Sequence, residues 1–135
     1  MSTGKPGCIM LIDNNPDDNF YHSRVIKKKD PSVEVLVMSS ATDALDYLQT
    51  ADQNKQQPDL IFLDINMPGM NGWDFMERYQ LQMPKSEGEA PVIIMLTTSE
   101  NPDDRRRAMQ SGAITDYMTK PLTLEMLASI DINFF

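Results

Sequence analysis

The sequence contains one cysteine, Cys8, so no disulfide bond can form within the chain. It also lacks a Cys/His cluster with the spacing of a zinc site. Both absences favour a reducing, cytoplasmic location. No apolar run approaches the roughly 20 residues that a membrane span needs, and the polar opening Met1–Gly7 does not resemble a signal peptide. We therefore expect a protein that neither enters the membrane nor leaves the cytoplasm.

Positive charge is also scarce, because 12 Lys and Arg residues stand against 20 Asp and Glu residues, for a formal net charge of -8. A nucleic-acid backbone would be repelled by most of such a surface, so direct nucleic-acid binding is not expected. The 135 residues are 41% hydrophobic and 24% charged, as in a soluble globular protein. This length suits one core. We expect a single domain over residues 1–135, with its core at about 7–132 and no output domain.

The sequence has no long hydrophobic run of the kind that a buried helix carries. Its hydrophobic runs are short and have the length of β-strands. Their apolar character is continuous, which is typical of parallel strands that are covered on both faces. Five strands are predicted, of which the last is the weakest: Cys8–Ile12, Val33–Val37, Leu60–Leu63, Val92–Leu96 and Ala113–Met118.

The segments between these runs carry apolar residues at helical spacing. Five helices are predicted: Pro16–Lys29 with a stripe of Phe20, Tyr21, Val25 and Ile26; Ala41–Leu48; Trp73–Met83; Asn101–Gln110; and Leu124–Ala128. Asn15 and Asn101 each precede a proline and two acids, which is a helix-start pattern. Asn71 is read as the cap of the third helix, and Gly112 as the stop of the fourth.

Five β-α units predict an α/β fold with a doubly wound parallel sheet of strand order 2-1-3-4-5, in which ligands bind beyond the carboxyl ends of the strands. Two longer loops, Gln53–Pro58 and Pro84–Ala90, are candidates for the rim of such a site.

Polar side chains stand directly after the apolar runs. Asp13 and Asn14 follow the first run, Asp64 the third, Thr97 the fourth, and Lys120 lies just past the fifth. The carboxyl ends of parallel strands meet at one edge, so carboxylates, a hydroxyl and an ammonium would share one pocket. Two carboxylates can hold Mg²⁺, and a metal and a lysine together can offset the charge of a transferred phosphoryl group.

Over essentially its whole length, the chain resembles the response regulator receiver family, of the single-domain, chemotaxis-regulator type with a flavodoxin-like fold. The matching segments are Leu11-Ile12-Asp13-Asn14, Leu63-Asp64-Ile65-Asn66-Met67-Pro68-Gly69-Met70-Asn71-Gly72, Met95-Leu96-Thr97-Thr98 and Tyr117-Met118-Thr119-Lys120-Pro121. The second and fourth segments are specific when they occur together and in this order.

The resemblance implies a role for several of these residues in a bacterial two-component system. Asp64 would be the phosphoacceptor, Thr97 would bond a phosphoryl oxygen, and Lys120 would pair with the phosphate. The backbone carbonyl of Asn66 would join Asp13, Asn14 and Asp64 as a Mg²⁺ ligand. Tyr117 would swing inward as the Thr97 loop shifts, and Lys120-Pro121 would be a cis peptide bond.

The chain departs from the family at Asn14, where a second acid usually follows Asp13. The amide keeps an oxygen but loses one negative charge, so we expect weaker Mg²⁺ binding rather than loss of the site. Asp17 and Asp18 could supply some charge, although a helix-start role is the preferred interpretation.

Four other residues or groups have plainer interpretations. His22 is expected at the surface, without a role in metal binding or phosphotransfer. Cys8 should pack as a small apolar group. The run Arg105–Arg107 reads as a solvated helix face, with docking as a second interpretation because the family uses this region for partner binding. Trp73 is expected to report on the state of the protein rather than to take part in its chemistry.

The leading hypothesis is a stand-alone receiver that takes a phosphoryl group from a histidine kinase or phosphotransfer protein and signals to a downstream protein. It would assist only its own phosphorylation and dephosphorylation, and so would not be an enzyme. One alternative is a degenerate receiver that binds partners without phosphorylation, for which Asn14 is the argument. Another is an aspartyl-nucleophile phosphatase, which needs a second Asp at the position of Asn66 as general acid.

Overall fold

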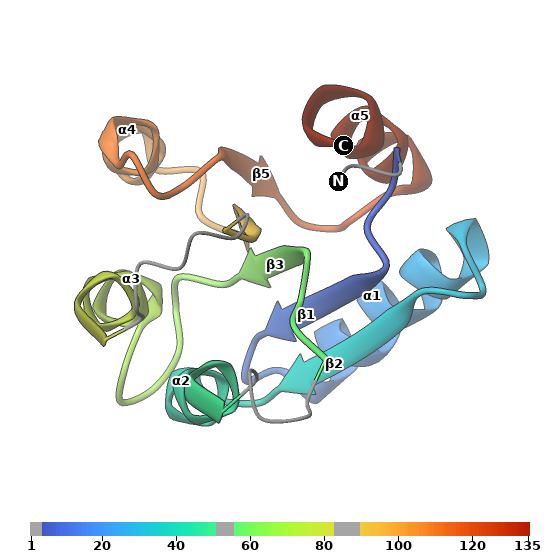
Figure 1. Ribbon diagram of the computed structural model, residues 1–135. Helices are drawn as coiled ribbons and strands as arrows, with labels where there is room; N and C mark the ends of the chain where they lie inside the picture. Colours follow the sequence, from blue (N-terminus) through green and yellow to red (C-terminus); the bar gives the residue numbers. More distant parts are fainter. Residues whose placement is uncertain (1–3, 51–55, 83–89) are drawn as a thin grey trace.

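The computed structural model describes residues 4–50, 56–82 and 90–135 (Figure 1). Strands and helices alternate along the described chain in the predicted order: β1 (Cys8–Ile12), α1 (Pro16–Lys29), β2 (Glu34–Met38), α2 (Ala41–Thr50), β3 (Leu60–Leu63), α3 (Gly72–Gln82), β4 (Val92–Thr97), α4 (Pro102–Gln110), β5 (Asp116–Thr119) and α5 (Leu124–Phe134). The strands form one parallel sheet in the order β2-β1-β3-β4-β5, which confirms the predicted doubly wound, flavodoxin-like fold.

Helices cover both faces of the sheet, with α1 and α5 on one face and α2, α3 and α4 on the other (Figure 1). Each face has its own hydrophobic cluster. Strands β1 and β3 are buried throughout, and β4 is buried from its second residue, as continuous apolar runs predict. The edge strand β2 differs, because Val37 is 45% exposed, so the expectation that every strand is covered on both faces is wrong for this edge.

Several boundaries differ from the predicted ones, most of them by one or two residues, while α5 extends to Phe134 instead of ending at Ala128. Strand β2 starts one residue late because the Val33 N–H donates to the Asp30 carbonyl in a turn. Strand β5 starts at Asp116, because Ile114 bonds back to Ser111 after α4. Helix α4 ends at Gln110, as predicted, but its C-cap is Ser111 rather than Gly112.

The predicted helix starts are confirmed. The Asn15 side chain accepts hydrogen bonds from the N–H groups of Asp17 and Asp18, and the Asn101 side chain accepts one from the N–H of Asp103. Asn71 accepts from the Asp74 N–H while Asp74 accepts from the Asn71 N–H, a reciprocal arrangement that satisfies two donors at the start of α3. These caps fix where each helix begins relative to the strand before it.

The predicted apolar stripe of α1 is only half correct, because Ile26 is buried and Val25 packs against the core while Phe20 and Tyr21 do not. Phe20 is 65% and Tyr21 50% exposed, whereas the residues of α1 that are buried are Asn19, His22 and Ile26. A hydrophobic pattern locates an inward face only when that face is apolar, and the inner face of α1 is largely polar at its N-terminal end. Helix α5 shows a smaller difference, because Leu127 and Ile130 are buried while the predicted stripe residues Leu124 and Ala128 are exposed.

Cys8 is fully buried in β1, as predicted, and burial together with the nearby Asp59 and Glu34 raises the pKa of its thiol to about 11. Such a thiol stays protonated and packs as an apolar group. Met83, most of the predicted loop Pro84–Ala90 and the first part of Gln53–Pro58 lie outside the described residues. Within the described ranges, no helix is both long and apolar enough to cross a membrane.

Gly72, the first residue of α3, packs against the backbone that carries Asp64. A Cβ atom at Gly72 would lie 2.5 Å from the Asp64 carbonyl oxygen and 2.9 Å from the Ile65 Cα. The Gly72 N–H also donates to the Ile65 carbonyl at 2.8 Å. The hydrogen bond holds the end of β3 against the start of α3, and the close approach of the two backbones leaves room only for glycine.

We expect Gly72→Ala to lower the free energy of unfolding by about 3 kcal/mol, because the backbone of Asp64 and Ile65 must move to admit a methyl group. Gly69 is the matched control: its φ of +75° disfavours alanine, but no atom lies within 4 Å of its Cβ position. Gly69→Ala should therefore cost only about 1 kcal/mol. Urea unfolding of both variants measures the difference, and equal losses would contradict the close-contact explanation.

Candidate functional site

Two buried carboxylates lie side by side at the carboxyl edge of the sheet. Asp13 follows β1 and Asp64 follows β3, and the last residues of these strands, Ile12 and Leu63, are register partners. The Asp64 N–H donates to the Ile12 carbonyl at 3.0 Å, which continues the ladder past the strand end. Both side chains are almost fully buried. Parallel pairing therefore brings the two predicted acids together, although 51 positions separate them in the sequence.

Lys120 reaches this pair from the end of β5. Its N–H donates to the Thr97 carbonyl at 2.8 Å, and the peptide bond to Pro121 is cis, as the family resemblance implied. Its Nζ lies 2.6 Å from Asp13 Oδ2 and 3.5 Å from Asp64 Oδ2, and its side chain is only 9% exposed. The predicted carboxylates and ammonium therefore share one buried cluster.

The cluster shifts the ionisation of its members. Burial and the nearby Asp13 raise the pKa of Asp64, while Lys120, a hydrogen bond with the Thr97 side chain and the Ile65 N–H oppose this rise. Burial alone would lower the pKa of Lys120, but its hydrogen bonds to Asp13 and Asp18, with further attraction from Asp64, raise it. Lys120 is therefore held as an ammonium, and ionised Asp64 depends on this cation.

Thr97 and Tyr117, the two residues predicted to move together, are connected through Ser99. Thr97 is fully buried, and its Oγ1 accepts a hydrogen bond from the Ser99 N–H at 3.2 Å. The Tyr117 hydroxyl donates to the Ser99 carbonyl at 2.8 Å, and its ring is buried. Ser99 Oγ in turn lies 2.6 Å from Asp104 Oδ2, in the first turn of α4. Tyr117 thus occupies an inward position in this structure.

The arginines of α4 are exposed, as predicted for a solvated face, but two of them also contact aromatic rings. The guanidinium of Arg105 lies 5.7 Å from the centre of the Tyr117 ring, and that of Arg107 lies 4.4 Å from the centre of the Trp73 ring. Cation–π contacts of this kind attract a helix to its neighbours without burying its charge. They join α4 to both β5 and α3.

The remaining predicted site residues, Asn14 and Asn66, lie on exposed loops next to the carboxylates. Asn14 follows Asp13 directly, and Asn66 stands two residues after Asp64. Both residues are exposed, unlike the buried carboxylates beside them in the sequence.

Three residues of α1 lie at the site, although the sequence favours a helix-start role for Asp18 and indicates no role there for Asn19 or His22. Asp18 Oδ2 lies 2.8 Å from Lys120 Nζ. The Asn19 side-chain N–H donates to the Asp13 carbonyl at 2.8 Å, and Asn19 Oδ1 is buried without a hydrogen-bond partner among the described residues. His22 is buried, which contradicts the predicted surface position, and its pKa is lowered by burial and by Lys120.

A signal for these residues exists in the sequence. Asp18 and His22 are four residues apart, so they lie on one side of a helix whose cap, Asn15, comes two residues after Asp13. That side must face the strand end that the helix has just left. Polar spacing of this kind, rather than apolar spacing, marks the inner face at the start of α1.

Within residues 4–50, 56–82 and 90–135, no group of three or more His, Cys, Asp or Glu side chains is arranged to hold a metal ion. The site instead offers two carboxylates, Asp13 and Asp64, with the ammonium of Lys120 between them. This arrangement already accommodates a cation. It fits Mg²⁺, which takes one or two carboxylates and fills its other positions with carbonyl oxygens, water and phosphate.

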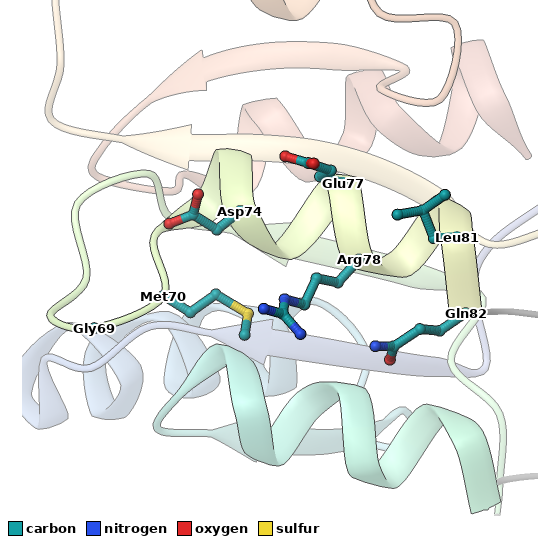
Figure 2. Close-up of a pocket in the computed structure, with 7 residues that line it drawn as sticks. All are labelled: Gly69, Met70, Asp74, Glu77, Arg78, Leu81 and Gln82. Atoms are coloured by element: carbon teal, nitrogen blue, oxygen red, sulfur yellow. The ribbon is translucent and has the colours of Figure 1, made fainter.

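A hollow of about 500 Å³ lies away from the strand-end cluster, along α3 and the loop before it. Gly69 and Met70 line one end, Leu81 and Gln82 the other, and the side chains of Met70 and Arg78 point toward each other between them (Figure 2). None of the predicted site residues lines this hollow. The chemistry of the strand-end cluster therefore does not extend into it.

Known proteins resemble this chain in both sequence and structure. A family model described as the response regulator receiver domain matches residues 9–130. Protein PilH of Pseudomonas aeruginosa is 32% identical over 119 residues, which cover 88% of this chain and 89% of PilH. A two-component response regulator from Cytophaga hutchinsonii has a TM-score of 0.84 at 27% identity, with 96% of this chain and 98% of that chain covered. The phosphorylated cyanobacterial phytochrome response regulator RcpA has a TM-score of 0.73 at 25% identity, with 93% and 88% covered.

The curated relatives differ widely in length, because the chain spans 13% of one and 89% of another. The activities of the longer relatives belong to those whole proteins and are not assigned to this chain. The match to the family model covers most of this chain, and the five-stranded parallel sheet agrees with it. The chain belongs to the response regulator receiver family of two-component signalling.

Proposed function

We propose that this receiver accepts a phosphoryl group on Asp64 from the phosphohistidine of a histidine kinase or phosphotransfer protein. The observation that carries the proposal is the buried cluster of Asp13, Asp64 and Lys120, with Thr97 beside it, at the carboxyl edge of the sheet. RcpA, a structure with the same fold, has been solved in a phosphorylated form. We place this exchange in the cytoplasm, because a chain with one cysteine forms no internal disulfide bond.

The roles follow from the positions of the side chains. A carboxylate oxygen of Asp64 attacks phosphorus in line, the P–N bond of the donor breaks, and the imidazole leaves with the electron pair. The Thr97 hydroxyl donates to a phosphoryl oxygen, and the Lys120 ammonium pairs with another. Asp13, Asp64, the Asn66 carbonyl and the Asn14 amide oxygen are the groups that would hold Mg²⁺, which offsets negative charge on a transferring phosphoryl group.

Output is proposed to pass through protein contacts on the α4–β5–α5 face. Ser99 is bonded to Thr97, Tyr117 and Asp104, so a shift of Thr97 toward a phosphoryl group would pull on both β5 and α4. The contact of Arg105 with Tyr117 extends this connection to the surface. Residues 1–135 would act as one receiver unit that turns over no separate metabolite and contacts protein partners rather than nucleic acid.

The exposed neutral Asn14 favours a second candidate, a receiver that binds its partner without phosphorylation. The phosphatase alternative is weaker, because the position of its general acid holds Asn66, whose amide cannot donate and retake a proton.

We expect the wild-type protein, incubated with acetyl phosphate and Mg²⁺, to gain the mass of one phosphoryl group, and chelation of the metal to abolish the gain. Asp64→Asn should gain nothing, while Asp46→Asn, which removes an exposed carboxylate of α2, should behave as wild type. Intact-mass spectrometry measures all four samples. A wild type that takes no phosphoryl group at any Mg²⁺ concentration would favour the phosphorylation-independent module.

Asn14→Asp should increase the affinity for Mg²⁺ about tenfold, because it returns a carboxylate next to Asp13. Calorimetric titration of the unphosphorylated protein measures this affinity. Gln80→Glu adds the same charge on the exposed side of α3 and should leave it nearly unchanged. An affinity that Asn14→Asp does not alter would mean that position 14 contributes nothing to metal binding.

Ionised Asp64, which the proposed attack requires, is costly to the fold. Its pKa in the folded state lies above its ordinary value of 3.8, chiefly because of burial. A raised carboxyl pKa contributes stability below pH 3.8, where Asp64 is protonated in both states, and this contribution is lost as the pH rises through the folded-state pKa.

We therefore expect metal-free Asp64→Asn to be more stable than wild type at neutral pH, with an advantage that shrinks as the pH falls toward about 4. Urea unfolding at several pH values measures the trend, with Asp46→Asn as the control for a general change in net charge. An advantage that grows as the pH falls would have the wrong sign for a buried, destabilised carboxylate.

A further inference from the structure

Lys120 has three anionic partners, and they lie at unequal distances from its ammonium group. Its Nζ lies 2.6 Å from Asp13, 2.8 Å from Asp18 and 3.5 Å from Asp64. The two closest carboxylates come from different elements, since Asp13 ends β1 while Asp18 stands in the first turn of α1. Under the proposed function, Asp13 and Asp64 are also the groups that would hold Mg²⁺. Lys120 and the metal would therefore compete for them.

Both carboxylate oxygens of Asp13 are in use. Oδ1 accepts the Asn15 N–H at 2.9 Å, and Oδ2 accepts from Lys120. Turning Asp13 toward a metal removes the closest partner of an ammonium that is almost fully buried. A buried charge without a partner is costly, so Lys120 needs another anion within reach.

Asp18 has the position and the hydration for this task. Its backbone N–H is capped by Asn15 Oδ1 at 3.2 Å, which fixes its place one turn into α1. Its side chain is 36% exposed against 9% for Lys120, so it reaches the buried ammonium while remaining in contact with solvent. It lies outside the set of residues that would hold the metal.

We propose that Asp18 is a positioning residue for Lys120: it holds the ammonium while Asp13 turns to the metal. This role rests on the proposed function. It predicts that Asp18 helps metal binding through Lys120, by drawing the competing ammonium away from Asp13 rather than by contacting the ion.

The test is the Mg²⁺ affinity of the unphosphorylated chain, measured by calorimetry for wild type, Asp18→Asn and the matched control Asp17→Asn. Asp17 is the neighbouring acid in the same helical turn, and it is exposed. Asp18→Asn should weaken Mg²⁺ binding about fivefold more than Asp17→Asn does. Asp18→Glu, which keeps the charge, should restore most of the affinity.

The same substitution in a Lys120→Met background separates the mechanisms. Without an ammonium to compete, Asp18→Asn should weaken Mg²⁺ binding no more than Asp17→Asn. An equal loss with and without Lys120 would overturn the proposal, because Asp18 would then act on the ion itself. Equal effects of Asp18→Asn and Asp17→Asn in the wild-type background would also overturn it. Circular dichroism confirms that each variant is folded.

The acetyl phosphate reaction of the wild type keeps this inference separate from the proposed function. A Mg²⁺-dependent phosphoryl adduct combined with equal effects of the two asparagine variants would leave the function intact and remove the role of Asp18. Absence of an adduct, with a Lys120-dependent effect of Asp18→Asn on Mg²⁺ binding, would remove the proposed phosphoacceptor function and leave the role of Asp18 toward Lys120 intact.

Discussion

The ammonium of Lys120 is buried among three carboxylates at the carboxyl edge of the sheet and holds them together there. Its partners Asp13 and Asp64 come from positions 107 and 56 residues away. Without Lys120, two buried carboxylates would lie side by side with no cation, and an uncompensated buried charge usually costs more than the intact ion pair contributes. Lys120 therefore constrains how β1, β3 and the end of β5 meet, in addition to any chemistry it performs.

This constraint explains why α1 departs from the usual amphipathic pattern. A helix that starts directly after Asp13 must face the strand ends with its first two turns, and those ends are polar. Asn19 bonds the Asp13 carbonyl, Asp18 pairs with Lys120, and His22 is buried beside them. The apolar Phe20 and Tyr21 are left facing solvent. In the first two turns of this helix, burial is decided by the charges opposite rather than by hydropathy.

The sequence predicted the element order, the strand order and the meeting of Asp13, Asp64, Thr97 and Lys120, because these follow from buried strands and from the shared edge of a parallel sheet. It failed where position depends on tertiary contacts. Burial of His22 could not be read from the apolar residues around it, and the contact of Asp18 with Lys120 joins residues 102 positions apart. The exposure of β2 was missed although the predicted strand order places this strand at the edge, because continuous apolar character predicts cover on both faces for every strand alike.

Charge counting indicates why the cluster would respond to phosphorylation. Around Lys120, three carboxylates face one ammonium, so the described cluster has an excess of negative charge. A phosphoryl group on Asp64 would replace a singly charged carboxylate by a group with more negative charge and more acceptor oxygens. The ammonium would then be drawn from Asp13 and Asp18 toward Asp64, and the Thr97 hydroxyl would turn the same way. Because Ser99 joins Thr97 to Tyr117 and to α4, a charge added at a buried strand end would reach the surface as a change of shape.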